Sequence, residues 1–339
     1  MQIKNIQRVE LEISSDCNAA CPGCARTQNL DILKPQNLTL QQIKNWFPDP
    51  KGIKFKFCGV LGDPIVNPEC LEITQYLVEK GAFIQYSTNG GRNSASWWNE
   101  LGKLNIKVNF CVDGTHSNYI YRVNTNFDII KRNMKAYSDA GGQGTWIYIV
   151  FDHNEHEVDE AKKLAREYGF DFATRTGMRN SYHDWVSKIG KKNDKTDVVI
   201  TTSGAKEHSK KAVVAELDKF ITNENKSEQQ TKEILSSIDC KFYHGKEIFI
   251  AANSTVWPCC FLWDSAFKNK EQILDKYKTF PTDWNNLQFH SLDEILSTEY
   301  YQKVLQDSWD PKHNLHISRC IRTCAKKGAY QNEIKFHDK

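Results

Sequence analysis

The amino-acid sequence predicts an α/β protein, and three observations support that fold class. Six short segments between residues 9 and 175 are alternating or continuously apolar, as β-strands are. Each of the first five is followed by an amphipathic segment of helical period. Glycine, proline or asparagine separates many of these segments. Strands that alternate with helices form parallel sheets with the helices outside, so we expect a barrel or partial barrel.

The expected elements follow one another closely in the first half of the chain. The expected strands cover residues 9–13, 53–58, 83–87, 106–112, 145–151 and 171–175. The expected helices cover residues 39–46, 68–81, 94–104, 126–140 and 155–168. Thr39 is expected to cap the first helix, and His153 and Asn154 to cap the last. A direct contact of His153 or His156 with a substrate is the alternative.

Length and composition indicate a soluble globular protein. Of the 339 residues, 40% are apolar and 26% are charged, and the net charge is +3. The longest strongly apolar run, residues 146–151, is too short to cross a bilayer. No secretory signal is recognised at the start of the chain, so we expect a cytoplasmic protein without a membrane partner. No basic stripe with interleaved aromatic residues is present in the sequence, and no nucleic-acid partner is expected.

Three cysteines, Cys17, Cys21 and Cys24, follow the first strand within eight residues. Three thiolates on one loop cannot all pair as disulfides, and eleven cysteines in a cytosolic chain indicate metal binding. Three ligands on a four-iron cube leave one iron open, whereas a closed electron-transfer cluster takes four. Zinc is the alternative, but it favours four ligands, and the nearest fourth cysteine is Cys58 in another element.

Polar and glycine-containing segments follow the predicted strands. They are Gly62-Asp63-Pro64, Thr88-Asn89-Gly90 and Asp113-Gly114. The carboxyl ends of parallel strands lie at one rim of a barrel, so we expect these segments to meet the cysteine loop there.

The Cys17, Cys21 and Cys24 spacing resembles the signature of radical S-adenosylmethionine (radical SAM) enzymes, and the resemblance extends over about half the chain. It implies a partial (β/α)6, TIM-like barrel with a [4Fe–4S] cluster whose open iron is chelated by SAM. One electron, from an external donor such as flavodoxin or ferredoxin, then cleaves SAM to a 5′-deoxyadenosyl radical. That radical abstracts hydrogen from an unactivated C–H bond.

The same resemblance assigns SAM contacts. The matching residues are Gly59, Gly62, Asp63, Ser87, Thr88, Asn89, Cys111, Asp113 and Arg122. The resemblance places the methionine ammonium at Asp63, the ribose at Thr88 and Asn89, and the SAM carboxylate or ribose at Arg122. An ordinary Gly-Asp-Pro turn and a salt-bridged arginine are the alternatives. Relatives carry Glu at position 63, Ser at position 111 and an aromatic residue at position 23, where this chain has Gly.

Four more cysteines in the last third of the chain can close a second cluster site. A hairpin over residues 248–259, with its turn at Asn253-Ser254, delivers Cys259, and a helical stretch over residues 291–309 precedes the final pair. The region resembles the twitch domain, a short form of the SPASM extension that carries an auxiliary [4Fe–4S] cluster. The resemblance assigns Cys240, Cys259, Cys320 and Cys324 as ligands. Cys260 is the expected non-ligand, although the two neighbours could exchange roles, and zinc is the alternative metal.

The sequence thus predicts three parts. Residues 1–178 form the barrel, residues 179–239 a lysine-rich linker or lid, and residues 240–339 a small α+β iron–sulfur domain. Cys58, Cys70 and Cys111 are expected to be small buried apolar residues.

The resemblance implies an oxidoreductase that catalyses net oxidation, either dehydrogenation or cross-link formation. A small-molecule substrate is slightly favoured, because no added peptide-binding domain is recognised. A peptide- or protein-modifying maturase is the first alternative, and a non-catalytic, metal-stabilised binding protein is the second. No catalytic acid or base is identified from the sequence.

Overall fold

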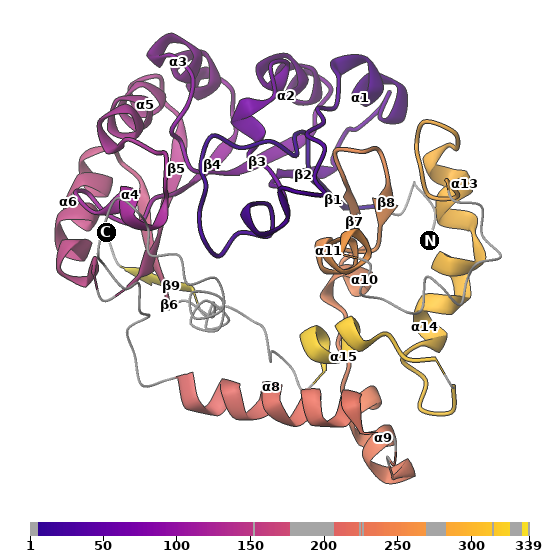
Figure 1. The fold of residues 1–339 in the computed structure, drawn as a ribbon. Helices are drawn as coiled ribbons and strands as arrows, with labels where there is room; N and C mark the ends of the chain where they lie inside the picture. Colours follow the sequence, from indigo (N-terminus) through magenta and orange to yellow (C-terminus); the bar gives the residue numbers. More distant parts are fainter. Residues whose placement is uncertain are drawn as a thin grey trace. The chain divides into compact units, whose positions relative to one another are not determined.

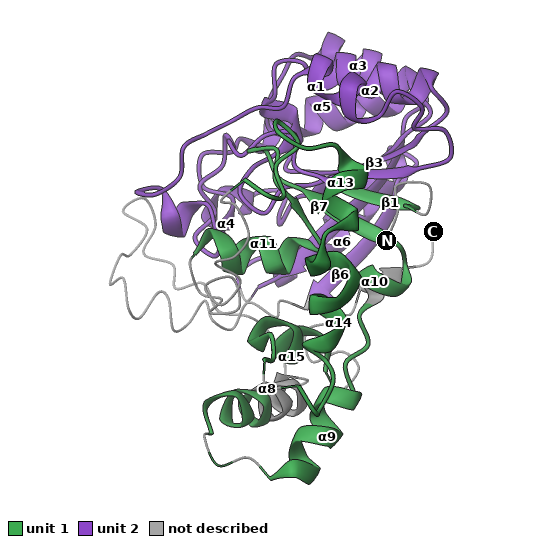
Figure 2. Cartoon of the chain, turned by 90° about the vertical axis from the view of Figure 1, so that its right-hand side faces the viewer, with its two compact units in different colours: residues 1–10, 205–331 green, residues 11–204, 332–339 purple. Residues whose placement is uncertain are grey.

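The computed structural model describes residues 6–151, 153–176, 207–223, 225, 227–268, 283–313, 315–325 and 334–337. The chain divides into two compact units (Figure 2). Unit 1 comprises residues 1–10 and 205–331, and unit 2 comprises residues 11–204 and 332–339.

Unit 2 is built on a parallel sheet, as the alternation of strands and helices predicts. Strands β2 (Lys54–Phe57), β3 (Phe83–Thr88), β4 (Lys107–Cys111), β5 (Gln143–Val150) and β6 (Asp171–Thr176) pair in that order, all in parallel. The end of β1 (Arg8–Leu11) lies next to β2, because the Cys58 N–H donates to the Leu11 carbonyl at 3.4 Å. A last strand, β9 (Ile334–His337), pairs antiparallel with β6 and is absent from the sequence-based prediction.

The helices of unit 2 cover one side of this sheet (Figure 1). They are α1 (Leu40–Trp46), α2 (Cys70–Glu79), α3 (Ala95–Lys103), α5 (Phe127–Asp139) and α6 (Val158–Glu167). Shorter helical segments are η2 (Thr27–Asn29), η3 (Pro64–Val66), α4 (Asn118–Tyr121) and η4 (Glu155–Glu157). Thr39 caps α1 in a capping box with Gln42, which confirms the expected start of that helix.

The predicted cap of the last helix is wrong. Asn154 makes no side-chain cap on η4. Its carboxamide instead accepts from the Phe151 N–H at 2.7 Å and donates to the Asp113 carbonyl at 2.8 Å. Asn154 is fully buried. Its side chain therefore supplies hydrogen bonds to backbone groups of Phe151 and Asp113 that water cannot reach.

Aromatic side chains fill the core between sheet and helices. Trp98 of α3 packs on Phe110 of β4 at 5.4 Å between ring centroids, and Phe110 stacks on Phe170 at 5.4 Å. Trp98, Phe110 and Tyr137 are completely buried. Burial of each such side chain contributes about 1.5–3 kcal/mol, which fixes the helices against the strands that carry the site.

Unit 1 contains part of the segment that the sequence predicts to be a linker or lid. Helices α8 (Glu207–Thr222) and α9 (Glu228–Ser236) pack on α15 (Ser318–Cys324). The contact buries Leu217, Phe220, Ile234, Leu235, Ile321 and Ala325. Helices α8 and α9 are therefore folded parts of unit 1. Residues 177–206 lie outside the described residues.

The predicted hairpin is present in unit 1. Strand β7 (Glu247–Ile250) pairs antiparallel with β8 (Val256–Trp257), and Ser254 in the turn has a φ of 69°. Around it lie α10 (Lys241–His244), α11 (Cys260–Phe267), α13 (Leu292–Ser297), the π-helix η5 (Tyr300–Val304) and α14 (Leu305–Asp307). In the described part of the chain, no helix combines the length and apolar character needed to span a membrane.

Candidate active site and auxiliary metal centre

The three cysteines of the first loop gather on one apolar cluster in unit 2. Cys21 is buried with Ala19, Ile120, Tyr121 and Phe151, and Cys17 and Cys24 pack against the same cluster. The loop is held by backbone hydrogen bonds from Cys24 to the Cys21 carbonyl at 3.1 Å and from Ala20 to the Val123 carbonyl at 2.9 Å. The loop therefore presents three thiols from one buried surface.

Cys17 has the surroundings of a thiolate ligand. Its Sγ accepts from the Ala19 N–H at 3.3 Å and from Asn89 Nδ2 at 3.6 Å. Burial, with the nearby charge of Asp63, raises the pKa of the Cys17 thiol well above its usual value. The thiol would thus keep its proton until a metal displaces it.

The donor set fits an iron–sulfur cluster better than a single ion. Among the residues that the structure describes, no three His, Cys, Asp or Glu side chains are arranged to hold one metal ion. Cysteines of a four-iron cluster each bind a different iron, so they do not converge on one point. Three thiols on one loop match that requirement.

Asp63 binds the neighbouring loop with its whole carboxylate. Oδ1 accepts from Thr88 Oγ1 at 2.7 Å and from the Ile65 N–H at 3.3 Å. Oδ2 accepts from the Asn89 backbone at 2.7 Å and from Asn89 Nδ2 at 2.8 Å. These four donors use about all the lone pairs that a carboxylate offers. Burial nevertheless raises the pKa of Asp63. A contact from Asp63 to the SAM ammonium, still a prediction, would have to displace one of these bonds.

Gly59 and Gly62 are required by the protein backbone itself. A Cβ at Gly62 would lie 2.0 Å from the Ser14 carbonyl oxygen and 2.7 Å from that of Asp16. A Cβ at Gly59 would lie 2.5 Å from the Gly62 carbonyl oxygen. The glycines therefore let this loop close on the segment after β1. A contact of Gly59 or Gly62 with SAM stays a prediction.

Arg122 and Asp113 form a buried ion pair. Asp113 is completely buried, and its Oδ2 accepts from Arg122 Nε at 2.7 Å, while its Oδ1 accepts from the Ile149 N–H at 2.8 Å. The terminal nitrogens of Arg122 make no hydrogen bond within the part of the chain that the structure describes. Asp113 thus orients the guanidinium and leaves its fork for another partner.

Two other predicted SAM contacts, Ser87 and Cys111, lie on strands β3 and β4. Ser87 of β3 pairs with Asn109 of β4, and Cys111 ends β4, where burial raises the pKa of its thiol. His153 stacks on Phe151 at 5.3 Å between ring centroids. The His156 side chain is 74% exposed, which places it at the surface of unit 2.

Buried asparagines hold this rim together, and the sequence analysis missed them. Asn67 donates to the carbonyls of Ile13 at 2.6 Å and Leu38 at 2.8 Å. Asn118 accepts from the Asp113 N–H at 2.8 Å. Their signal in the sequence is an amide a few residues beyond a predicted strand, which is also common in solvent-exposed turns.

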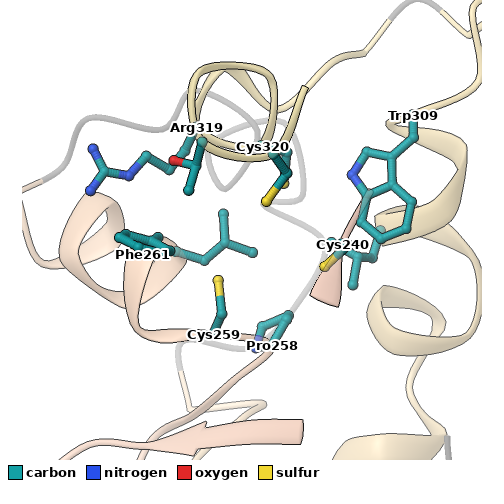
Figure 3. A pocket seen from close by; sticks show the side chains of 11 residues that line it. Cys240, Pro258, Cys259, Phe261, Trp309, Arg319 and Cys320 are labelled. Atoms are coloured by element: carbon teal, nitrogen blue, oxygen red, sulfur yellow. The ribbon is translucent and has the colours of Figure 1, made fainter. Parts of the chain in front are cut away.

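The four cysteines predicted for the second cluster all line one pocket in unit 1 (Figure 3). The pocket holds about 300 Å³ of empty space, including space open to solvent. Cys259 precedes α11, and Cys320 and Cys324 lie four residues apart on one face of α15. Cys260 is not among the residues that line the pocket.

Two of these thiols interact directly. A hydrogen bond with Cys324, helped by backbone N–H groups of Tyr243 and Phe242, lowers the pKa of Cys240 to about 7. Burial raises the pKa of Cys259 to about 12. Four cysteine thiols that line one pocket suit an iron–sulfur cluster.

Two family models match separate parts of this chain. Residues 11–165 match the radical SAM superfamily, and residues 240–325 match SPASM, an iron–sulfur cluster-binding domain. Among curated proteins, the mycofactocin maturase MftC of Mycobacterium tuberculosis is 26% identical over 163 residues. That match covers 47% of this chain and 41% of MftC, so it spans less than half of the relative.

Solved structures share the fold. Histidine-tagged anSMEcpe with bound AdoMet superposes with a TM-score of 0.52 and 14% identity, over 89% of this chain and 80% of that one. Streptococcus suis SuiB bound to S-adenosylmethionine gives a TM-score of 0.51 and 13% identity, over 93% and 77% of the two chains. At these identities the comparison establishes the partial barrel with its C-terminal domain.

The expected cofactors follow from the two domains. The radical SAM domain implies a [4Fe–4S] cluster with SAM, and the SPASM domain implies auxiliary iron–sulfur binding. This chain therefore carries a radical SAM superfamily domain over residues 11–165, followed by a SPASM iron–sulfur cluster-binding domain over residues 240–325.

Proposed function

We propose that this protein is a maturase that oxidises a side chain of a peptide or protein substrate. The observation that carries the proposal is the pairing of a radical SAM domain with a four-cysteine pocket in one chain related to a maturase. Native anSMEcpe, of the same fold (TM-score 0.50, 14% identity), is solved with AdoMet and a Cp18Cys peptide, which adds support. The relatives favour this alternative over the small-molecule substrate that the sequence analysis preferred.

The protein's own residues have distinct parts in this proposal. Cys17, Cys21 and Cys24 hold the first cluster. The Asp63–Asn89 hydrogen bonds fix the loop beside Cys17, and the free fork of Arg122 binds the SAM carboxylate. When bound, the first cluster and SAM supply a 5′-deoxyadenosyl radical, and the second cluster supplies a one-electron acceptor.

Net oxidation balances with these parts. With both clusters and SAM bound, the substrate would give a hydrogen atom to the adenosyl carbon, and then one electron to the auxiliary centre and one proton to solvent or a side chain. The external donor supplies the electron that cleaves SAM. Cys240, Cys259, Cys320 and Cys324 are proposed to occupy all protein ligand positions of the auxiliary cluster, which suits it to electron transfer.

Deuterium transfer tests the substrate class. Anaerobically reconstituted protein is given SAM and dithionite with either peptides or small metabolites from cells grown in deuterated medium. Because abstracted hydrogen goes to 5′-deoxyadenosine, deuterium in that product identifies the fraction that contains the substrate. We expect deuterium with the peptide fraction. Transfer from the metabolite fraction alone would contradict the proposal, and the Cys17→Ala variant provides the background.

A further inference from the structure

Trp309 carries a buried hydrogen-bond donor with no partner. Its indole Nε1 is inaccessible to solvent and makes no hydrogen bond in the part of the chain that the structure describes. A buried indole N–H normally finds an acceptor, because leaving one unmade costs about 1–3 kcal/mol. An acceptor for this donor would have to come from a bound group.

The donor lies at the four-cysteine pocket. Trp309 lines this pocket, and Figure 3 shows its indole nitrogen on the ring edge that faces Cys320. Arg319 also has an unpartnered buried Nε at this pocket. Its guanidinium, however, points away from the sulfurs, lying over the Phe261 ring at 5.3 Å and donating to Asp264 at 3.3 Å. Trp309 is thus the donor directed toward the cysteines.

Several contacts fix the Trp309 ring. Its backbone N–H donates to the Gln306 carbonyl at 2.9 Å, and its ring meets that of Tyr243 at 5.7 Å and 86°. The preceding carbonyl, of Ser308, lies 3.2 Å from His316 Nδ1. A donor held in this way is preorganised for its acceptor.

We propose that Trp309 donates its indole N–H to a sulfur of the auxiliary cluster and raises the reduction potential of that cluster. The inference rests on the proposed ligand set of Cys240, Cys259, Cys320 and Cys324. Reduction adds negative charge to the cluster, so an N–H···S bond strengthens in the reduced state and favours it. Trp309 is a positioning and tuning residue, and it makes the auxiliary centre a better electron acceptor.

The test uses the full chain with Cys17, Cys21 and Cys24 replaced by Ala, so that only the second cluster contributes. In this background we compare Trp309→Phe with Trp263→Phe. Trp263 is a matched control, because its Nε1 is also buried without a partner in the described structure but it does not line the pocket. The readout is the midpoint potential from EPR-monitored titration, with iron and sulfide content measured on each sample.

We expect Trp309→Phe to weaken the reduced state about tenfold, which is a fall of ~59 mV for one electron. Trp263→Phe should keep the parental potential. An exchangeable deuteron coupled to the reduced cluster should disappear only in Trp309→Phe. An unchanged potential in a fully loaded Trp309→Phe protein overturns the proposal.

If Trp309→Phe loses the cluster, a second variant, Trp309→His, decides between the two explanations, because histidine retains an N–H. Cluster retention in Trp309→His would support the donor role, whereas loss in both variants would show that ring packing alone matters. Absence of iron from the parent itself would refute the auxiliary ligand set, and with it this inference. Because iron content is read separately, that failure is distinct from an unchanged potential.

Discussion

Asn89 donates two hydrogen bonds to a single carboxylate oxygen of Asp63, from its backbone N–H at 2.7 Å and from its side-chain Nδ2 at 2.8 Å. The same Nδ2 lies 3.6 Å from Cys17 Sγ. One buried carboxylate therefore fixes both the loop after β3 and a donor to a cysteine of the first cluster. This relationship assigns Asp63 a structural role that is measurable without SAM.

Asp63→Asn should destabilise the protein even when neither cluster nor SAM is present. An amide replaces one acceptor oxygen by an NH2 group, so at least one buried donor of Thr88, Asn89 or Ile65 loses its acceptor. We expect a loss of about 1–3 kcal/mol in the free energy of unfolding, measured by urea denaturation of the cluster-free chain. Asp139→Asn, at an exposed pair with Lys135, should cost less than about 1 kcal/mol. Equal stabilities for Asp63→Asn and wild type would leave only a ligand-binding role for Asp63.

Cys259→Ala and Cys260→Ala should differ sharply although the residues are neighbours. Cys259 lines the pocket with Cys240, Cys320 and Cys324, whereas Cys260 does not line it. We expect Cys259→Ala to lose the auxiliary cluster, which is about four irons per chain, and Cys260→Ala to retain it. Iron and sulfide analysis with EPR of the reduced protein measures this. The reverse result would exchange the two roles.

Gly62→Ala should prevent the loop from closing on the segment that follows β1. The added methyl would meet backbone oxygens of Ser14 and Asp16, which cannot move aside as a flexible side chain can. We expect a loss of more than about 3 kcal/mol. Gly169→Ala is the comparison, because no atom lies within 4 Å of its Cβ and only its φ of +67° is unfavourable. That substitution should cost about 1–2 kcal/mol. Similar losses in both variants would show that the crowding at Gly62 is relieved easily.

The sequence was informative where local chemistry decides the structure. The strands and helices of unit 2 follow the hydrophobic period, and Thr39 caps its helix through its own side chain. Strand β9 was missed because its pairing with β6 joins residues far apart in the chain, which no local pattern reports. Helix α8 lies in the segment predicted as a linker or lid, and the burial of its Leu217 and Phe220 depends on contacts around α15 that no local pattern reports.

The candidate site shows the same division. The cysteines could be found from spacing alone, because ligands on one loop are close in sequence. The partners of Asp63 and Asp113 could not be found, because they depend on Asn89, Asn118 and Ile149 from other strands and loops. A glycine such as Gly62 is visible in the sequence, but the backbone it approaches is known only after folding.

Glu157 should make stability depend on pH in a defined direction. Its Oε2 accepts from the backbone of Thr115 at 2.6 Å and of His116 at 2.8 Å. Burial raises the pKa of Glu157, but hydrogen bonds from His116 and its neighbours outweigh it and bring the pKa below the ordinary 4.5. A lowered pKa means that the folded state holds the proton less tightly than the unfolded state. The stabilisation is therefore present above pH 4.5 and lost as the pH falls through the lower, folded-state value.

Glu157→Gln reports that stabilisation. We expect the cluster-free variant to be less stable than wild type by about 1.5–3 kcal/mol at pH 7, which lowers Tm by about 2–4 °C per kcal/mol. The difference should shrink as the pH falls below 4.5. Thermal unfolding across pH measures it, and a gap that stays constant with pH would show that the charge of Glu157 contributes nothing.

Arg122→Lys should separate the two functions of the guanidinium. Asp113 is completely buried, so removing the cation would leave an unpaired buried carboxylate at a cost of about 3–5 kcal/mol. Lysine keeps a positive charge for Asp113 but lacks the planar fork that matches a carboxylate. The guanidinium lies over the Tyr121 ring at 5.6 Å, and its terminal nitrogens make no hydrogen bond in the described structure, so that fork is the part proposed to hold SAM. We therefore expect the Arg122→Lys variant to have a stability within about 1.5 kcal/mol of wild type and a SAM affinity at least about tenfold weaker, or ~1.4 kcal/mol.

Anaerobic titration of the reconstituted protein with SAM measures the affinity. Arg132→Lys is the control, because Arg132 donates to Asn93 and Asn133. Unchanged SAM affinity in Arg122→Lys would restrict Arg122 to pairing with Asp113.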